Sequence, residues 1–192
     1  MLAYERSAVK CSECPLSDRN RVWGQGNLNS TNNGIILIGE APGQQEDQYG
    51  APFVGKAGQV LDDGLKEASI ERSAGWTTNA LVCRPPNNDF QSHEAQVARD
   101  KCRPGMREEL DMLGEYGYRI IVPLGNNACK SIGVTGGITR IRGGAYEKMG
   151  FIVMPTFHPS YVARGLPKDP EERRDVSRWN LFVKDLLLVR EK

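Results

Sequence analysis

The stretch Gly34-Ile35-Ile36-Leu37-Ile38-Gly39 is an apolar, β-branched run bounded by glycines, and the polar segment Glu40–Asp47 (EAPGQQED) follows it directly. A run of this length is too short for a helix and is typical of a strand that is buried on both faces. Strands of this kind form parallel sheets covered by helices. The stretch therefore indicates an α/β fold with a polar loop at the carboxyl end of a buried strand.

Three further runs have the same character, and helical patterns lie between the runs. Strands are expected at Trp76–Cys83, Arg119–Gly125 and Phe151–Phe157. Helices are expected at Ala57–Ser69, at Glu94–Leu113 with an interruption at Pro104, at Asn126–Ile132, and over a C-terminal stretch with Trp179, Phe182, Val183, Leu186 and Val189 on one face. This alternation predicts one α/β domain over residues 1–192, with a central four-stranded parallel sheet flanked by helices in a three-layer sandwich.

Composition narrows the class of protein but does not identify a partner. Hydrophobic residues make up 39% and charged residues 26%, which is ordinary for a globular protein. No apolar run approaches the roughly 20 residues that a membrane helix needs. The first residues carry charges where a signal peptide would be apolar, so a cytoplasmic protein is expected. A net charge of +1 neither supports nor excludes nucleic acid, because affinity follows local patches.

The expected fold also predicts where the ligand binds. Ligands of open parallel sheets lie beyond the carboxyl ends of the strands. The segments richest in chemically active side chains each follow an expected strand: Glu40–Asp47, Arg84–Asp89 and His158–Arg164. We therefore expect these three loops to meet in one cleft.

Four of the five cysteines have a suggestive spacing. Cys11 and Cys14 form a C-x-x-C pair, and eighteen residues separate Cys83 from Cys102. A disulfide is not expected in a reducing cytoplasm. Scattered core thiols, structural zinc and a [4Fe–4S] cluster all stay open on spacing alone, although zinc sites commonly use two close pairs. Cys129 stands apart in an expected helix and is interpreted as a core residue.

The loop after the first strand contains small residues that let backbone N–H groups approach a ligand closely. It has neither the GxxxxGK[ST] nor the GxGxxG pattern of a phosphate-binding turn. Its acids Glu40, Glu46 and Asp47 have a plain alternative as solvated side chains. Phe53 lies between turns, where an exposed stacking surface is a better interpretation than a core aromatic.

Two polar residues stand out in or directly after expected strands. Asn79 lies in an otherwise apolar strand, and a buried amide there must find hydrogen-bond partners, either in neighbouring backbone or in a ligand. His158 directly follows the fourth strand. It is therefore a better catalytic candidate than His93, which is expected in a polar loop, although a structural histidine is the alternative.

Together these segments resemble the family-4 uracil-DNA glycosylases, the iron–sulfur branch of that enzyme class. The resemblance runs nearly end to end, through CSECPLSDRNRVWGQGN, GEAPGQQEDQYGAPFVGKAG, TNALVCRPPNN, PLGNNACKSIG and PTFHPSYVARG. It implies a glycosylase-type three-layer sandwich and a DNA repair enzyme that flips uracil out and hydrolyses its N-glycosidic bond, leaving an abasic site. It also implies a [4Fe–4S] cluster on Cys11, Cys14, Cys83 and Cys102.

The resemblance further implies roles for single residues. The uracil pocket would consist of Glu40, Ala41, Pro42, Glu46, Phe53, Asn79 and His158. Phe53 would stack on the flipped base, Asn79 would read its Watson–Crick edge, and His158 would hydrogen-bond the uracil O2. Glu46 would occupy the space beside C5. Catalysis would involve Glu40, Asn88 and His158, with Asn88 as the candidate for positioning water.

The DNA contacts implied by the resemblance are Ser160, Tyr161, Val162 and Arg164, in a loop expected to enter the minor groove. Val162-Ala163 replaces two leucines common in the family, which leaves open single- or double-stranded uracil-containing DNA as substrate. The basic loop by which one related group becomes trapped on its product is absent around His93, so hydrolytic turnover is expected. A monomer without membrane contact is expected.

Two rival functions differ from this one in residues that the sequence shows. A non-catalytic DNA-binding module would be indicated by loss of the asparagine or the histidine, yet Asn79 and His158 are both present. A glycosylase of broader base choice tends to lack the acid that Glu40 supplies.

Overall fold

In the part of the chain that the structure describes, seven strands form one mixed sheet in the order β1-β2-β4-β3-β5-β7-β6. The computed structural model describes residues 2–7, 9, 11–28, 34–167, 169 and 171–192. The strands are β1 (Leu2–Tyr4), β2 (Gly24–Gly26), β3 (Ile35–Gly39), β4 (Trp76–Asn79), β5 (Ile120–Pro123), β6 (Tyr146–Lys148) and β7 (Phe151–Val153). The inner four, β4-β3-β5-β7, are parallel, which confirms the expected central sheet. Antiparallel β1, β2 and β6 extend it at both edges.

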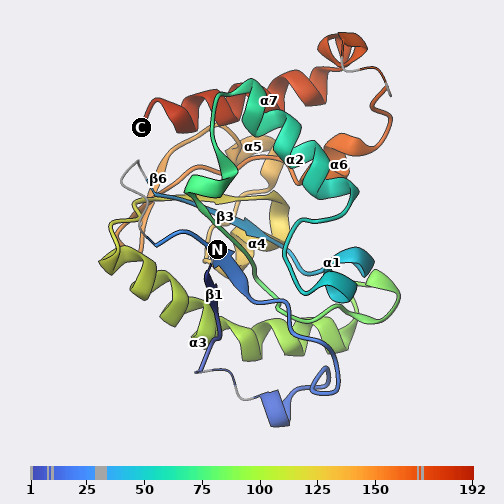
Figure 1. The fold of residues 1–192 in the computed structure, drawn as a ribbon, viewed down its shortest axis with the longest axis vertical. Helices are drawn as coiled ribbons and strands as arrows, with labels where there is room; N and C mark the ends of the chain where they lie inside the picture. The colour runs from blue at the N-terminus through green and yellow to red at the C-terminus, as the bar shows by residue number, and fades with distance from the viewer. Residues whose placement is uncertain (1, 8, 10, 29–33, 168, 170) are drawn as a thin grey trace.

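Helices cover both faces of this sheet. They are α1 (Gln44–Tyr49), α2 (Lys56–Glu67), α3 (His93–Glu115), α4 (Gly125–Ser131), α5 (Ile138–Ile141), α6 (Pro159–Ala163) and α7 (Ser177–Arg190), with 3-10 turns η1 (Cys11–Glu13), η2 (Arg72–Ala74), η3 (Pro86–Asn88) and η4 (Glu171–Asp175). Figure 1 shows α2, α6 and α7 together on one side of the sheet and α3 on the other.

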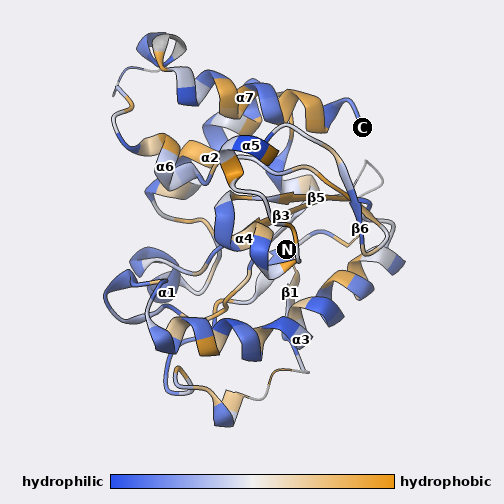
Figure 2. Ribbon diagram, turned by 180° about the vertical axis from the view of Figure 1, so that it is seen from behind, coloured by the Kyte–Doolittle hydropathy of each residue, from blue (hydrophilic) through white to orange (hydrophobic). Residues whose placement is uncertain are grey.

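The core is divided by the sheet because neighbouring residues of a strand point to opposite faces. Leu37 of β3 belongs to the cluster under α2 and α7, whereas Ile36 and Ile38 belong to the cluster under α3 and α4. Figure 2 shows hydrophobic residues concentrated on the central strands, between helices that are hydrophilic on their outer sides. The five apolar residues expected on one face of the C-terminal helix are all buried, and so is Cys129, as predicted.

Some expected boundaries were wrong. Helix α3 continues through Pro104, because buried residues on both sides of it, Cys102 and Met106, fix the helix against the core despite a local cost of about 3 kcal/mol. His93 begins this helix instead of lying in a loop, since the Ser92 hydroxyl caps it by accepting from Ala95 N–H at 3.2 Å. Strand β4 ends at Asn79, four residues early. Within the described residues, no helix has the length and apolarity that crossing a membrane requires.

Candidate active site

The carboxyl ends of the parallel strands bring two of the three expected loops together. Gly39 and Asn79 are register partners at the ends of β3 and β4. The Phe53 and His158 rings, from the first and third loops, have centroids 6.1 Å apart. In the second loop, Arg84–Asp89, Arg84 Nε donates to Asn88 Oδ1 at 2.7 Å, and Asp89 Oδ1 accepts from the Gln91 N–H at 2.9 Å. Neither contact reaches the other two loops. Asn88 is exposed in η3, and its role with water stays a prediction.

Gly39 leaves the space in which Asn79 and Phe53 meet. A Cβ added at Gly39 would lie 2.2 Å from Asn79 Oδ1 and 2.6 Å from Phe53 Cζ. Asn79 is only 2% exposed, and its side-chain oxygen and the edge of the Phe53 ring border the same space above Gly39. The arrangement therefore places polar groups that a planar, hydrogen-bonding ligand could satisfy beside an aromatic ring.

Phe53 does not form the exposed stacking surface expected from its sequence context. The residue has a left-handed backbone (φ 55°), its side chain is 6% exposed, and its ring packs with the α2–α7 core. Only the ring edge near Gly39 and the side toward His158 are directed at the site. Arg72 fixes this turn by donating to the carbonyl oxygens of Pro52 (2.8 Å) and Phe53 (3.1 Å).

His158 is held as a neutral hydrogen-bond donor. Its Nδ1 accepts from the Ser160 N–H at 3.1 Å and lies 2.8 Å from the Ser160 hydroxyl oxygen. An accepting Nδ1 carries no proton, so the proton is on Nε2. Burial, together with the positive charge of Arg164, lowers the pKa of His158 to about 4. Gly125 gives this residue room, since a Cβ there would lie 2.9 Å from His158 Cβ.

Glu40 is hydrogen-bonded by Asn127, a residue that was not among the expected site residues. Asn127 of α4 donates its Nδ2–H to Glu40 Oε1. Burial raises the pKa of Glu40, while this hydrogen bond and the positive charges of Arg99 and Lys130 oppose the rise. Asn127 follows β5 at the carboxyl edge of the sheet, so the rule used for the other loops could have identified it.

Glu46 is not a solvated acid. It is 8% exposed, and its carboxylate accepts from Gly43 N–H (3.0 Å) and Gly55 N–H (2.8 Å), which joins the two halves of the first loop. In the same loop Pro42 is buried, and Ala41 packs against the cluster of buried cysteines. The space beside the expected base is therefore bounded by a rigid turn.

The four spaced cysteines come together behind this loop. Cys14, Cys83 and Cys102 are buried in one cluster with Leu81, Val82 and Ala98. Cys11 lies beside them, and its sulfur accepts from Arg21 Nε at 3.3 Å, while Arg21 pairs by its backbone with Cys83.

The thiols also influence one another electrostatically. Burial, together with the neighbouring Cys102, Cys14 and Cys11, raises the pKa of Cys83 to about 12, although the positive charge of Arg21 opposes the rise. Across the described residues, no three or more His, Cys, Asp or Glu side chains are already arranged as ligands of a metal ion. The four thiol side chains thus lie in one region of the molecule, without the geometry of a metal site.

Helix α6 presents an aromatic side chain with two arginines. Tyr161 is 40% exposed, and the guanidinium carbons of Arg164 and Arg178 each lie 5.5 Å from its ring centroid. Arg178 of α7 was not singled out from the sequence; it also donates to the Tyr161 carbonyl oxygen at 3.2 Å. Ser160 is exposed, whereas Val162 is fully buried, so a contact of Val162 with DNA stays a prediction.

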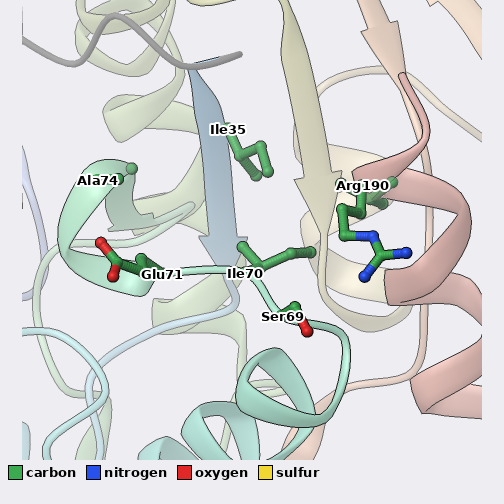
Figure 3. Close-up of a pocket in the computed structure, with 8 residues that line it drawn as sticks. Ile35, Ser69, Ile70, Glu71, Ala74 and Arg190 are labelled. Atoms are coloured by element: carbon green, nitrogen blue, oxygen red, sulfur yellow. The ribbon is translucent and has the colours of Figure 1, made fainter.

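A separate pocket of about 330 Å³ lies at the other end of β3, beside Ile35 (Figure 3). Ser69, Ile70 and Glu71 after α2 line one part of it, and Arg190 of α7 lines another. None of the site residues expected from the sequence lines this pocket. It therefore does not belong to the candidate site.

Comparisons with known proteins agree with these observations. A family model described as the uracil DNA glycosylase superfamily matches residues 25–180. A type-4 uracil-DNA glycosylase of Thermotoga maritima is 36% identical over 91% of this chain and 90% of its own length. A type-4 uracil-DNA glycosylase of Sulfurisphaera tokodaii is 34% identical over 81% of this chain and 72% of its own length. One of Pyrobaculum aerophilum is 30% identical over 88% of this chain and 87% of its own length. The matches confirm the resemblance inferred from the motifs.

Proposed function

We propose that this chain, which belongs to the uracil DNA glycosylase superfamily, flips uracil out of DNA and hydrolyses its N-glycosidic bond, leaving an abasic site. The observation that carries the proposal is that the buried Asn79 amide, the Phe53 ring and the neutral His158 donor lie together at the carboxyl edge of the sheet. The names of the relatives support the same chemistry. Uracil-containing DNA is the proposed substrate, single- or double-stranded, and the enzyme is proposed to act as a cytoplasmic monomer.

The proposed mechanism depends on charge that develops as the bond breaks. The sugar gains oxocarbenium character, and negative charge accumulates on the leaving uracil. A fixed donor aimed at that charge stabilises the transition state more than the ground state. His158 Nε2–H would donate to the uracil O2. Glu40, held by Asn127, and Asn88 are the candidates for orienting the attacking water.

Recognition would precede this step. Extruding the nucleotide costs a few kcal/mol, and stacking on Phe53 would recover about 1–3 kcal/mol of it. The Asn79 amide can accept from uracil N3–H and donate to O4, whereas cytosine presents an acceptor and a donor in the opposite order. Glu46, fixed by two backbone N–H groups beside Ala41 and Pro42, would occupy the space next to C5.

A [4Fe–4S] cluster on Cys11, Cys14, Cys83 and Cys102 is part of the proposal. The gathering of four thiol side chains, three of them buried, supports a four-thiolate site. When bound, the cluster would cross-link the N-terminal segment, the loop after β4 and α3. Its role would be structural.

The test is an excision assay with matched uracil and cytosine oligonucleotides, single- and double-stranded. Release of uracil from either, with no release of cytosine, is the expected result. DNA binding without any excision would favour the non-catalytic module, and release of hypoxanthine or mismatched bases at comparable rates would favour a relative with broader base choice.

A further inference from the structure

A fully buried ion pair lies under the carboxyl end of β4, on the α3 side of the sheet. Arg6, just after β1, and Glu109, in α3, are 103 residues apart in sequence. Their side chains are 0% exposed, and Arg6 Nη2 lies 2.8 Å from Glu109 Oε2. The pair takes no part in the proposed chemistry, although the positive charge of Arg6 opposes the rise in the pKa of the nearby Cys102.

The guanidinium of Arg6 binds the backbone where the chain leaves β4. Nη2 donates to the carbonyl oxygen of Asn79 at 2.7 Å and to the Thr78 hydroxyl at 3.0 Å, and Nη1 donates to the carbonyl oxygen of Ala80 at 3.4 Å. Arg6 therefore contacts the peptide unit that bears the proposed base reader.

Glu109 fixes this arginine and the strand together. Its carboxylate accepts from Arg6 Nε at 2.9 Å, from Trp76 Nε1 at 2.7 Å and from the Thr78 hydroxyl at 3.2 Å. Trp76 and Asn79 are the first and last residues of β4. One carboxylate and one guanidinium thus hold the whole strand from its α3 side.

Two glycines make room for the pair. A Cβ at Gly24 of β2 would lie 1.9 Å from Glu109 Oε1, and one at Gly105 of α3 would lie 2.7 Å from Arg6 Cβ. Neither glycine has a positive φ, so space rather than backbone conformation requires them. Replacing a buried ion pair by apolar residues is often neutral or stabilising, so stability alone is a weak reason for such a site.

We infer that Arg6 is a positioning residue for Asn79, which sets the orientation of the base-reading amide by fixing the Asn79–Ala80 peptide. The inference rests on the proposed function, because it takes Asn79 as the base reader. On the other side of the strand, Asn79 Oδ1 meets Phe53 over Gly39, so a rotation of this peptide would move the amide relative to the stacked base. The α3 side of the sheet thereby controls the geometry of the pocket.

The first measurement compares two mild variants in single-turnover uracil excision. Arg6→Lys keeps the positive charge and loses the forked geometry; Thr78→Val keeps the shape and removes one hydroxyl shared by both ions. A displacement on the order of 1 Å lowers rates up to about 10²-fold, so we expect a roughly tenfold lower rate with DNA affinity unchanged. Thr78→Ser should restore the rate lost in Thr78→Val.

The matched control is Arg173→Lys, which alters a partly buried ion pair with Asp63 between η4 and α2, and should leave the rate unchanged. Rates are compared per folded molecule, well below each melting temperature. If Arg6→Lys does not fold, Thr78→Val carries the same comparison.

A double-mutant cycle with Asn79→Ala decides whether Arg6 acts through Asn79. Residues that act as a unit are non-additive. We expect Arg6→Lys to slow excision in the wild-type background and to have no further effect once Asn79 is alanine. An equal loss in both backgrounds would overturn the inference and leave the proposed function intact. A wild-type rate for Asn79→Ala alone would overturn the inference and the proposed pocket together.

Discussion

At the level of single side chains, the charge state of His158 determines what the residue can do. Its Nδ1 is occupied by the Ser160 N–H, and its pKa is lowered to about 4. The ring is therefore neutral above about pH 4 and donates through Nε2. Removing this donor should lower the single-turnover rate of His158→Ala about 10²–10³-fold while DNA affinity changes little. An unchanged rate would show that His158 is structural.

The same pKa predicts the pH dependence of the wild-type rate. Because His158 is already neutral at pH 5, its titration should contribute no inflection between pH 5 and 8, where an ordinary histidine with a pKa near 6.5 would titrate. Single-turnover rates across this range check the prediction. An inflection near pH 6.5 that disappears in His158→Ala would contradict it.

Asn79 should determine which base is released. Asn79→Asp replaces the N–H₂ donor by an acceptor, so uracil O4 loses its partner while the cytosine amino group gains one. We expect uracil release to fall sharply and slow cytosine release to appear, measured with matched oligonucleotides. A mutant with full uracil activity and no cytosine release would remove Asn79 from the pocket.

Asn127 should tune the acid limb of the pH profile through Glu40. Its hydrogen bond opposes the rise in the pKa of that carboxyl, so Asn127→Ala should raise this pKa further. If Glu40 acts as a carboxylate, the rise of activity with pH then occurs at a higher pH in the variant than in the wild type. Asn126→Ala is the matched control, because Asn126 bonds the Ile138 N–H instead, and its acid limb should not move.

At the level of elements, α6 and α7 together form the exposed surface beside the site. The valine expected to enter DNA points into the core, and Tyr161, flanked by Arg164 and Arg178, is the exposed group. We expect Arg178→Ala to weaken DNA binding and to reduce the slope of log affinity against log salt by about one, as loss of one phosphate contact does. An unchanged slope would place Arg178 outside the DNA interface; Arg190→Ala, at the opposite end of α7, is the control.

At the level of the whole molecule, the cysteines connect parts of the chain far apart in sequence. If they hold a [4Fe–4S] cluster, purified protein should be yellow-brown and contain about four irons per chain. Cys83→Ser should chiefly lower the yield of folded protein. Colourless protein with stoichiometric zinc would contradict the cluster while keeping a four-thiolate site.

Local patterns in the sequence were sufficient for the four parallel strands, for the helices α2, α3 and α4, and for the buried face of the C-terminal helix. These features follow from periodicity within a few residues, which a single chain shows directly. The edges of the sheet were not predictable in this way, because β1, β2 and β6 have only three residues each, too few to show a period, and depend on their neighbours for pairing.

The candidate site shows the same difference between local sequence patterns and tertiary contacts. Sequence and resemblance identified Asn79 and His158 because an amide in a buried strand and a histidine after one are local anomalies. Only the tertiary structure decided that Phe53 turns inward, that Asn127 binds Glu40, and that Arg6 with Glu109 holds the end of β4. Two of these contacts join residues that are 87 and 103 positions apart, and the third depends on the left-handed backbone of Phe53. Their energies depend on burial, which a short stretch of sequence does not show.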